Sequence, residues 1–142
     1  MNKKGFTLIE LLAVIVIIGI IGLVAVPNML GISVNTKKEQ MLDDARKLIS
    51  VAKMKINTDY DARNSSTPTR YYFNDLNVKG DIKSDPDGGM YTNNSYVEYR
   101  KGETTASYCV YLEGTKRVIG TSTSCVMEAN LYSKSNVISK QT

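Results

Sequence analysis

The chain has 142 residues, 42% of them hydrophobic, and a formal net charge of +4 at pH 7. It contains no histidine, so neither a Ser-His-Asp nor a Cys-His catalytic arrangement can form, and the sequence has no glycine-rich phosphate loop. We therefore expect that the protein is not an enzyme, and no motif calls for a cofactor. The weakly basic charge permits contact with nucleic acid, but no basic motif with interleaved aromatic residues supports such a partner.

The first part of the chain combines a short basic leader with a long apolar segment. Residues 1–5 include two lysines, and residues 11–36 contain no charged residue. The apolar segment is too long for an ordinary secretory signal. As a helix it would measure about 39 Å, which exceeds the ~30 Å hydrocarbon core of a bilayer. We predict a transmembrane helix here, with residues 6–36 as the membrane and assembly half of a longer helix.

A single carboxylate, Glu10, lies at the edge of this apolar segment. A charge in such a place is costly and by default indicates function. The alternative is that Glu10 lies at headgroup depth near the helix N-terminus, where the helix dipole favours negative charge.

The residues around Glu10 resemble a known processing motif. The string Lys4-Gly5-Phe6-Thr7-Leu8-Ile9-Glu10 is similar to the one in type IV pilins, type II secretion pseudopilins and competence pseudopilins. The resemblance implies that a prepilin peptidase cleaves between Gly5 and Phe6 and then N-methylates Phe6. It also implies that Glu10 pairs with the Phe6 amine of a neighbouring subunit during filament assembly.

The same resemblance implies a structural subunit of a type IV pilus, made as a single-pass prepilin in the plasma (inner) membrane. The subunit would leave the lipid bilayer for a cell-surface filament of its own copies, alone or mixed with other subunits. A membrane platform protein and a cytoplasmic assembly ATPase would act on it indirectly, and the filament would serve adhesion, surface motility or related surface functions. Two alternatives stay open: a pseudopilin of a type II secretion or competence DNA-uptake system, and an uncleaved membrane-anchored binding module.

Beyond the apolar segment, the sequence predicts that one helix continues over residues 6–60. Apolar residues recur in residues 37–60 at spacings of three and four, which indicates an amphipathic helix whose apolar stripe packs on a sheet. Pro27 should kink the helix because it removes a backbone donor. The resemblance further implies that the segment with Gly19, Gly22 and Pro27 loses helicity in filaments. The residues of the apolar stripe are Met41, Leu42, Ala45, Leu48, Ile49, Ala52 and Ile56.

Residues 61–142 predict a globular, β-rich head. The turn residues at 85–89 indicate a tight turn, whereas residues 71–78 fit either a short strand or one helical turn. The predicted fold is α+β, with the long N-terminal helix packed on a small antiparallel sheet, which is the pilin fold that the resemblance implies. Hairpin strands are predicted at 95–100, 105–112 and 116–119, with a further strand around Val137 and Ile138.

The middle predicted strand carries one of two cysteines. Alternation places Tyr108, Val110 and Leu112 on one face, which we expect to cover the helix, and Cys109 on the other. Cys109 and Cys125 could form a disulfide in an extracellular head, which would close a loop of roughly 15 residues, or they could remain two buried thiols.

Three aspartates lie at the predicted turn. Asp81, Asp85 and Asp87 offer oxygen ligands of the kind that calcium takes, and the resemblance extends to an aspartate-rich turn in some pseudopilins. Their spacing matches no EF-hand loop, and a tight turn by itself selects Asp and Gly. Apart from these aspartates, the sequence indicates no metal site.

Overall fold

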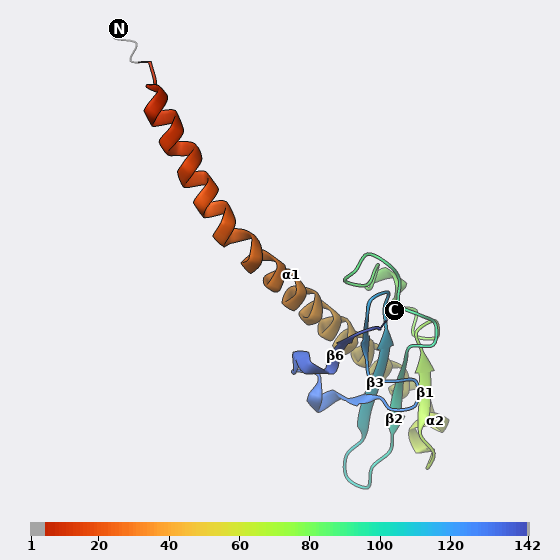
Figure 1. Cartoon of the computed structure of the whole chain (residues 1–142). Coiled ribbons are helices and arrows are strands. Elements are labelled where there is room, and N and C mark those ends of the chain that lie inside the picture. The colour runs from red at the N-terminus through yellow and green to blue at the C-terminus, as the bar shows by residue number, and fades with distance from the viewer. Residues whose placement is uncertain (1–4, 142) are drawn as a thin grey trace. The chain divides into compact units, whose positions relative to one another are not determined.

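The structure, a computed structural model, describes residues 5–141, apart from the side chains of residues 24–30 and Lys79. Figure 1 shows the long helix α1, Leu8–Thr58, followed by shorter elements. The chain forms two compact units, residues 1–36 and residues 37–142, and α1 contributes to both. Most of the predicted leader lies outside the described residues. The side chain of Pro27 does too, so the kink expected there stays a prediction.

Helix α1 begins later and ends earlier than the predicted helix over residues 6–60. Asp59 leaves the helical conformation, with φ −99° and ψ 92°, and its side chain accepts a hydrogen bond from the backbone N–H of Ala62 at 3.0 Å. An aspartate in this position caps the start of a helix. Tyr60 therefore belongs to a second short helix, α2, Tyr60–Asn64.

Residues 37–142 contain an antiparallel sheet in the order β1-β2-β3-β4-β6, with β5 paired to β3. The hairpin strands expected from the sequence are confirmed as β2, β3 and β4, and the strand expected around Val137 is β6. Residues 71–78, which fitted either a strand or a helical turn, form the end of β1 followed by a series of turns. Strand β5 was not predicted, because two residues are too few to show a periodic pattern. The strands are β1 Thr69–Tyr72, β2 Tyr96–Arg100, β3 Ser107–Glu113, β4 Arg117–Ile119, β5 Val126–Met127 and β6 Val137–Ser139, and short 3-10 helices lie at Val78–Gly80, Glu128–Asn130 and Lys134–Asn136.

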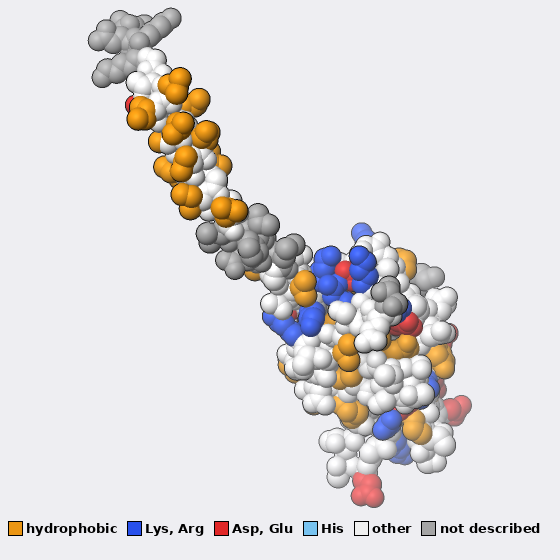
Figure 2. Space-filling view, viewed as in Figure 1, with side chains coloured by type: hydrophobic (Ala, Val, Ile, Leu, Met, Phe, Trp, Pro, Cys, Tyr) orange, Lys and Arg blue, Asp and Glu red, His pale blue; other side chains and the backbone are white. Residues whose placement is uncertain are grey.

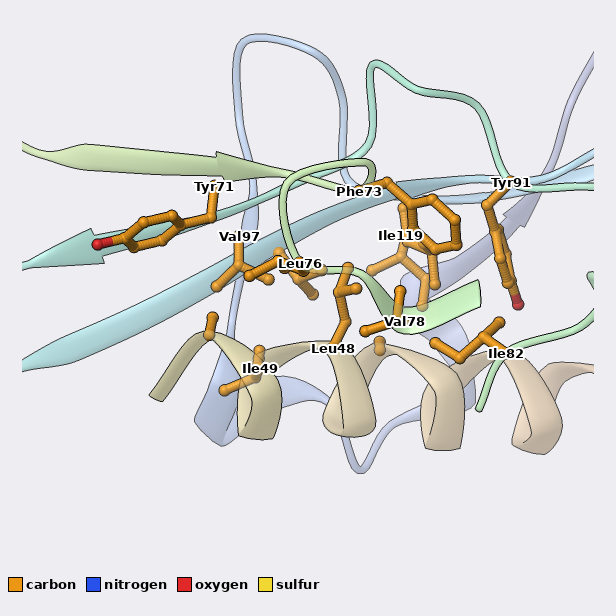
Figure 3. Close-up of a cluster of buried hydrophobic side chains, with 14 of the residues drawn as sticks. Leu48, Ile49, Tyr71, Phe73, Leu76, Val78, Ile82, Tyr91, Val97 and Ile119 are labelled. Atoms are coloured by element: carbon orange, nitrogen blue, oxygen red, sulfur yellow. The ribbon is translucent and has the colours of Figure 1, made fainter. Parts of the chain in front are cut away.

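The apolar stripe of α1 packs against one face of this sheet, as predicted. All seven of its residues are buried. On the sheet, Val110 and Leu112 belong to the same core, and Tyr108 packs at its margin. Figure 3 shows Leu48 and Val97 in one cluster between α1 and the sheet. The α+β arrangement follows, because the helix and the sheet each cover the apolar face of the other.

The chain between β1 and β2 supplies a second part of the core. Within this stretch the sequence predicts a tight turn at residues 85–89 and, over residues 71–78, either a short strand or one helical turn. Its apolar residues have no constant spacing, so periodicity could not predict their burial. The buried residues are Phe73, Leu76, Val78, Ile82 and Tyr91, which Figure 3 shows above α1.

Candidate functional site

The first turn of α1 is closed by a reciprocal pair of hydrogen bonds between Thr7 and Glu10. The backbone N–H of Thr7 donates to Glu10 Oε2 at 2.9 Å, and the backbone N–H of Glu10 donates to Thr7 Oγ1 at 3.4 Å. This is a capping box, in which a Thr at the N-cap and a Glu three residues later satisfy each other's free donors. The role of Thr7 was not predicted from the sequence, although the Thr-x-x-Glu spacing is a known signal of a helix start.

Only one carboxylate oxygen of Glu10 is used in this way. Within the described part of the chain, Oε1 of Glu10 has no hydrogen-bond donor. A carboxylate can accept several hydrogen bonds. Glu10 can therefore hold the first turn of its own helix and still accept from a second group.

The peptide bond between Gly5 and Phe6 lies just before the capped turn. Phe6 is 85% exposed, and a Cβ added to Gly5 would have no atom within 4 Å. No other described residue covers this peptide bond, so a catalytic group of another protein could approach it without unfolding α1.

The helix that follows presents an unusually large exposed apolar surface. Figure 2 shows hydrophobic side chains along this part of α1. A Cβ at Gly19 or Gly22 would likewise meet nothing within 4 Å. Soluble monomers rarely leave a continuous apolar surface of this kind uncovered. The exposed large residues are Leu11, Leu12, Val14, Ile15, Val16, Ile17, Ile18, Ile20, Ile21 and Leu23.

The expected membrane span at 11–36 includes this surface. Across the described residues, which leave out the side chains of 24–30, no helix is both long and apolar enough to cross a membrane.

In the head, a disulfide joins Cys109 to Cys125, whose Cα atoms are 5.4 Å apart. Beside it lies Glu98, which is 3% exposed and accepts hydrogen bonds from Arg70 Nε at 2.7 Å and Arg100 Nε at 2.6 Å. Burial raises the pKa of Glu98, but the two arginines outweigh burial and hold the pKa below its usual value. Glu98 is thus a buried, ionised group of the sheet, and these two cysteines do not offer free thiols.

The three aspartates considered for calcium lie in different surroundings. Asp85 is buried, and both its oxygens are occupied, because the backbone N–H groups of Asp87 and Gly89 and both donors of Thr115 point at it. Burial raises the pKa of Asp85, but these donors together lower it. Asp81 is exposed at the end of a 3-10 helix. Asp85 therefore fixes the turn that precedes β2.

Asp87 makes ion pairs instead. It contacts Arg117, and Lys37 Nζ lies 3.3 Å from its Oδ1. Within the described part of the chain, Glu98, Cys109 and Cys125 are the group of three with closely spaced ligand atoms, but both sulfurs belong to the disulfide and offer no thiolate to a metal ion. The three aspartates do not form such a group.

The comparisons with known proteins concern the N-terminus. Residues 1–26 match the family described as the prokaryotic N-terminal methylation motif. No curated protein and no solved structure matches the chain. The matched residues include Gly5, Phe6 and Glu10 and end before the amphipathic half of α1. The protein thus carries the N-terminal methylation motif that is characteristic of type IV pilin and pseudopilin prepilins, followed by an α+β layout consistent with the pilin fold.

Proposed function

We propose that the protein is a structural subunit of a type IV pilus filament, made as a membrane-anchored prepilin and displayed at the cell surface after processing. The match of residues 1–26 to the methylation motif carries this proposal. The filament would serve adhesion, surface motility or a related surface function.

Processing acts on the open peptide bond before the capped turn. A prepilin peptidase hydrolyses the amide between Gly5 and Phe6 and then methylates the Phe6 amine. The exposure of Phe6 and the free space around Gly5 support this step. Glycine suits the site because the missing Cβ lets the backbone approach a catalytic group closely.

Assembly uses the new amine. Glu10 Oε1, which has no donor among the described residues, accepts from the Phe6 amine of another copy while Oε2 keeps the capping box. A buried pair of this kind costs about 3 to 5 kcal/mol to break, so it fixes the register of neighbouring subunits.

The exposed apolar side chains of α1 are covered by lipid before assembly and by other copies afterwards. Small residues such as Gly19 and Gly22 let helices approach closely, and with Pro27 they allow the segment to lose helicity in the filament. Assembly needs energy from elsewhere, because the sequence has no glycine-rich phosphate loop for a nucleotide. A membrane platform protein and an assembly ATPase supply it.

Mass spectrometry of sheared surface filaments tests the proposal. The expected result is an abundant peptide that begins with N-methyl-Phe6. If filaments form without this peptide, the chain is a minor subunit or a pseudopilin of a secretion or DNA-uptake system. If the mature protein keeps residues 1–5, it is instead an uncleaved membrane-anchored binding module.

A further inference from the structure

A groove of about 570 Å³ lies at the edge of the sheet where β4 begins and β6 ends. The two strands hold its walls together: Arg117 is paired with Ser139, and the backbone N–H of Lys140 donates to the carbonyl of Lys116 at 2.9 Å. We call it the basic groove, and its lining residues are Thr115, Lys116, Arg117, Ser139, Lys140 and Gln141.

Cations outnumber carboxylates in and around the basic groove. Arg117 and Lys37 share the buried carboxylate of Asp87, and Lys140 Nζ lies 2.8 Å from Glu113 Oε1. Within the described residues, the exposed Lys116 has no ion pair. Figure 2 shows Lys and Arg side chains gathered around acidic atoms on the viewed face of residues 37–142.

A third carboxylate, Asp85, accepts hydrogen bonds from the backbone N–H and the hydroxyl of Thr115 in the lining. Four cations against three carboxylates leave a net charge of +1 (4 − 3) in and around the groove. The internal pairs hold Arg117 and Lys140 in position, whereas the Lys116 ammonium keeps all three of its donors for a ligand. Ser139 adds a hydroxyl and Gln141 an amide. Phosphate oxygens are the acceptors that such a set of cationic and neutral donors fits.

We propose that the basic groove binds the phosphate of an anionic phospholipid headgroup while the subunit is in the membrane. Lys37, at the flank of the groove, is the first charged residue after the uncharged segment 11–36. Basic clusters directly beside a membrane segment are attracted to anionic lipid surfaces. This inference rests on the membrane stage of the proposed function.

A nucleic acid is the other source of phosphate groups, and the lining disfavours it. None of the six lining residues is aromatic. Proteins that hold single strands stack successive bases on aromatic side chains beside a basic groove. The basic groove has hydrogen-bond donors for phosphate oxygens but no aromatic surface on which bases could stack.

The test is a titration of the isotope-labelled full chain in neutral dodecyl-maltoside micelles, followed by the amide NMR signals of residues 115–117 and 139–141. The titrants are dihexanoyl-phosphatidylglycerol and its zwitterionic phosphatidylcholine counterpart. We expect the anionic lipid to shift these signals with clearly higher affinity. Lys116→Gln should weaken that affinity about fivefold, and adding Lys140→Gln about fivefold more.

Lys101→Gln is the matched control. Lys101 is an exposed lysine in the loop that precedes β3, whereas the basic groove begins just after the other end of β3. This substitution should leave the affinity unchanged. Lys116→Gln alone keeps the test valid should the double variant fail to fold, since it breaks no ion pair among the described residues. Unchanged amide signals outside the groove verify folding.

Equal affinity for the two lipids, or an unchanged affinity in Lys116→Gln, overturns the inference. Tighter binding of a short DNA duplex to the same residues at the same salt concentration also overturns it, in favour of nucleic acid. The peptide that begins with N-methyl-Phe6 is measured separately. Its presence together with a failed titration rejects the basic groove alone, whereas a mature protein that keeps residues 1–5 rejects the processing on which the proposed function depends.

Discussion

A buried hydrogen bond between Tyr91 and Asp44 ties the segment before β2 to α1. The Tyr91 hydroxyl donates to Asp44 Oδ2 at 2.8 Å, and Lys47 Nζ lies 3.6 Å from the other oxygen. Burial raises the pKa of Asp44, although both partners oppose the increase. Replacing Tyr91 by Phe removes a donor from a buried carboxylate, and we expect a loss of about 1 to 3 kcal/mol in the free energy of unfolding.

The pH dependence of the stability cost distinguishes the lost hydrogen bond to Asp44 from a mere loss of packing. A carboxyl group with a raised pKa in the folded protein lowers stability as the pH rises through that pKa. Tyr91→Phe raises the pKa of Asp44 further, so its cost should be larger at pH 7 than at pH 4 in urea titrations. Tyr60→Phe, at a tyrosine that is 71% exposed, should cost little at either pH. An equal cost of Tyr91→Phe at both pH values would show that Asp44 is not involved.

Glu98 has the opposite pH dependence. Its pKa is lowered against the effect of burial by Arg70 and Arg100, so its stabilisation is present above the ordinary value of about 4.3 and disappears as the pH falls through the folded value. Glu98→Gln should cost about 1.5 kcal/mol at pH 7, at the low end for charged hydrogen bonds because solvent screens the partly exposed arginines.

Acid titrations of the unfolding free energy measure the effect of Glu98. The difference between Glu98→Gln and the unsubstituted protein should shrink as the pH falls below about 4. Glu103→Gln, at an exposed residue in the loop between β2 and β3, is the control and should shift stability by less than about 0.5 kcal/mol. A difference that stays constant down to acid pH would contradict an ionised Glu98.

At the scale of elements, the disulfide holds the short strand β5 against β3. Cys109 lies in β3, where it is paired with Met127 of β5, and Cys125 directly precedes β5. A two-residue strand has little pairing energy of its own. Because the bridge spans a sequence separation of 16 residues, the chain-entropy model gives it about 3 kcal/mol.

The double substitution Cys109→Ser/Cys125→Ser should therefore lower the free energy of unfolding by about 2 to 4 kcal/mol. Amide hydrogen exchange should rise first in residues 120–127. Adding a reducing agent should reproduce this loss in the unsubstituted protein and have no effect on the double variant. If the unsubstituted protein loses no stability on reduction, the bridge does not stabilise the head.

The elements differ in how well the sequence predicts them, and the reason is whether a local pattern determines them. The stripe from Met41 to Ile56 repeats with the helical period, and the hairpin strands alternate between turn signals, so both were predictable. The core residues of the segment 73–91 have no period. The contact of Glu98 with Arg70 joins residues 28 positions apart and depends on the register of β1 and β2.

The candidate site was predictable because it lies within seven consecutive residues, Lys4 to Glu10, whose types and order carry the resemblance. Thr7 also had a local signal, the capping-box spacing. The basic groove had none, because its lining comes from β4 and β6 and is brought together only by their pairing.

At the scale of the whole molecule, two roles of Glu10 have to be separated: closing its own helix and pairing with another copy. Glu10→Gln keeps a carbonyl oxygen that can complete the capping box but removes the charge. Thr7→Ala removes the capping hydroxyl, at a cost of about 0.5 to 2 kcal/mol, and keeps the charge.

Filament yield in cells that express only the variant decides between these roles. If the Glu10 carboxylate pairs with the Phe6 amine, Glu10→Gln should reduce sheared filaments about a hundredfold, as expected for a lost buried pair. Thr7→Ala should reduce them far less. N-methyl-Phe6 should appear in both variants, because the bond after Gly5 lies outside the capping box. Normal assembly of Glu10→Gln together with failure of Thr7→Ala would assign Glu10 to the helix start alone, and subunit register would then have to come from the apolar face of α1.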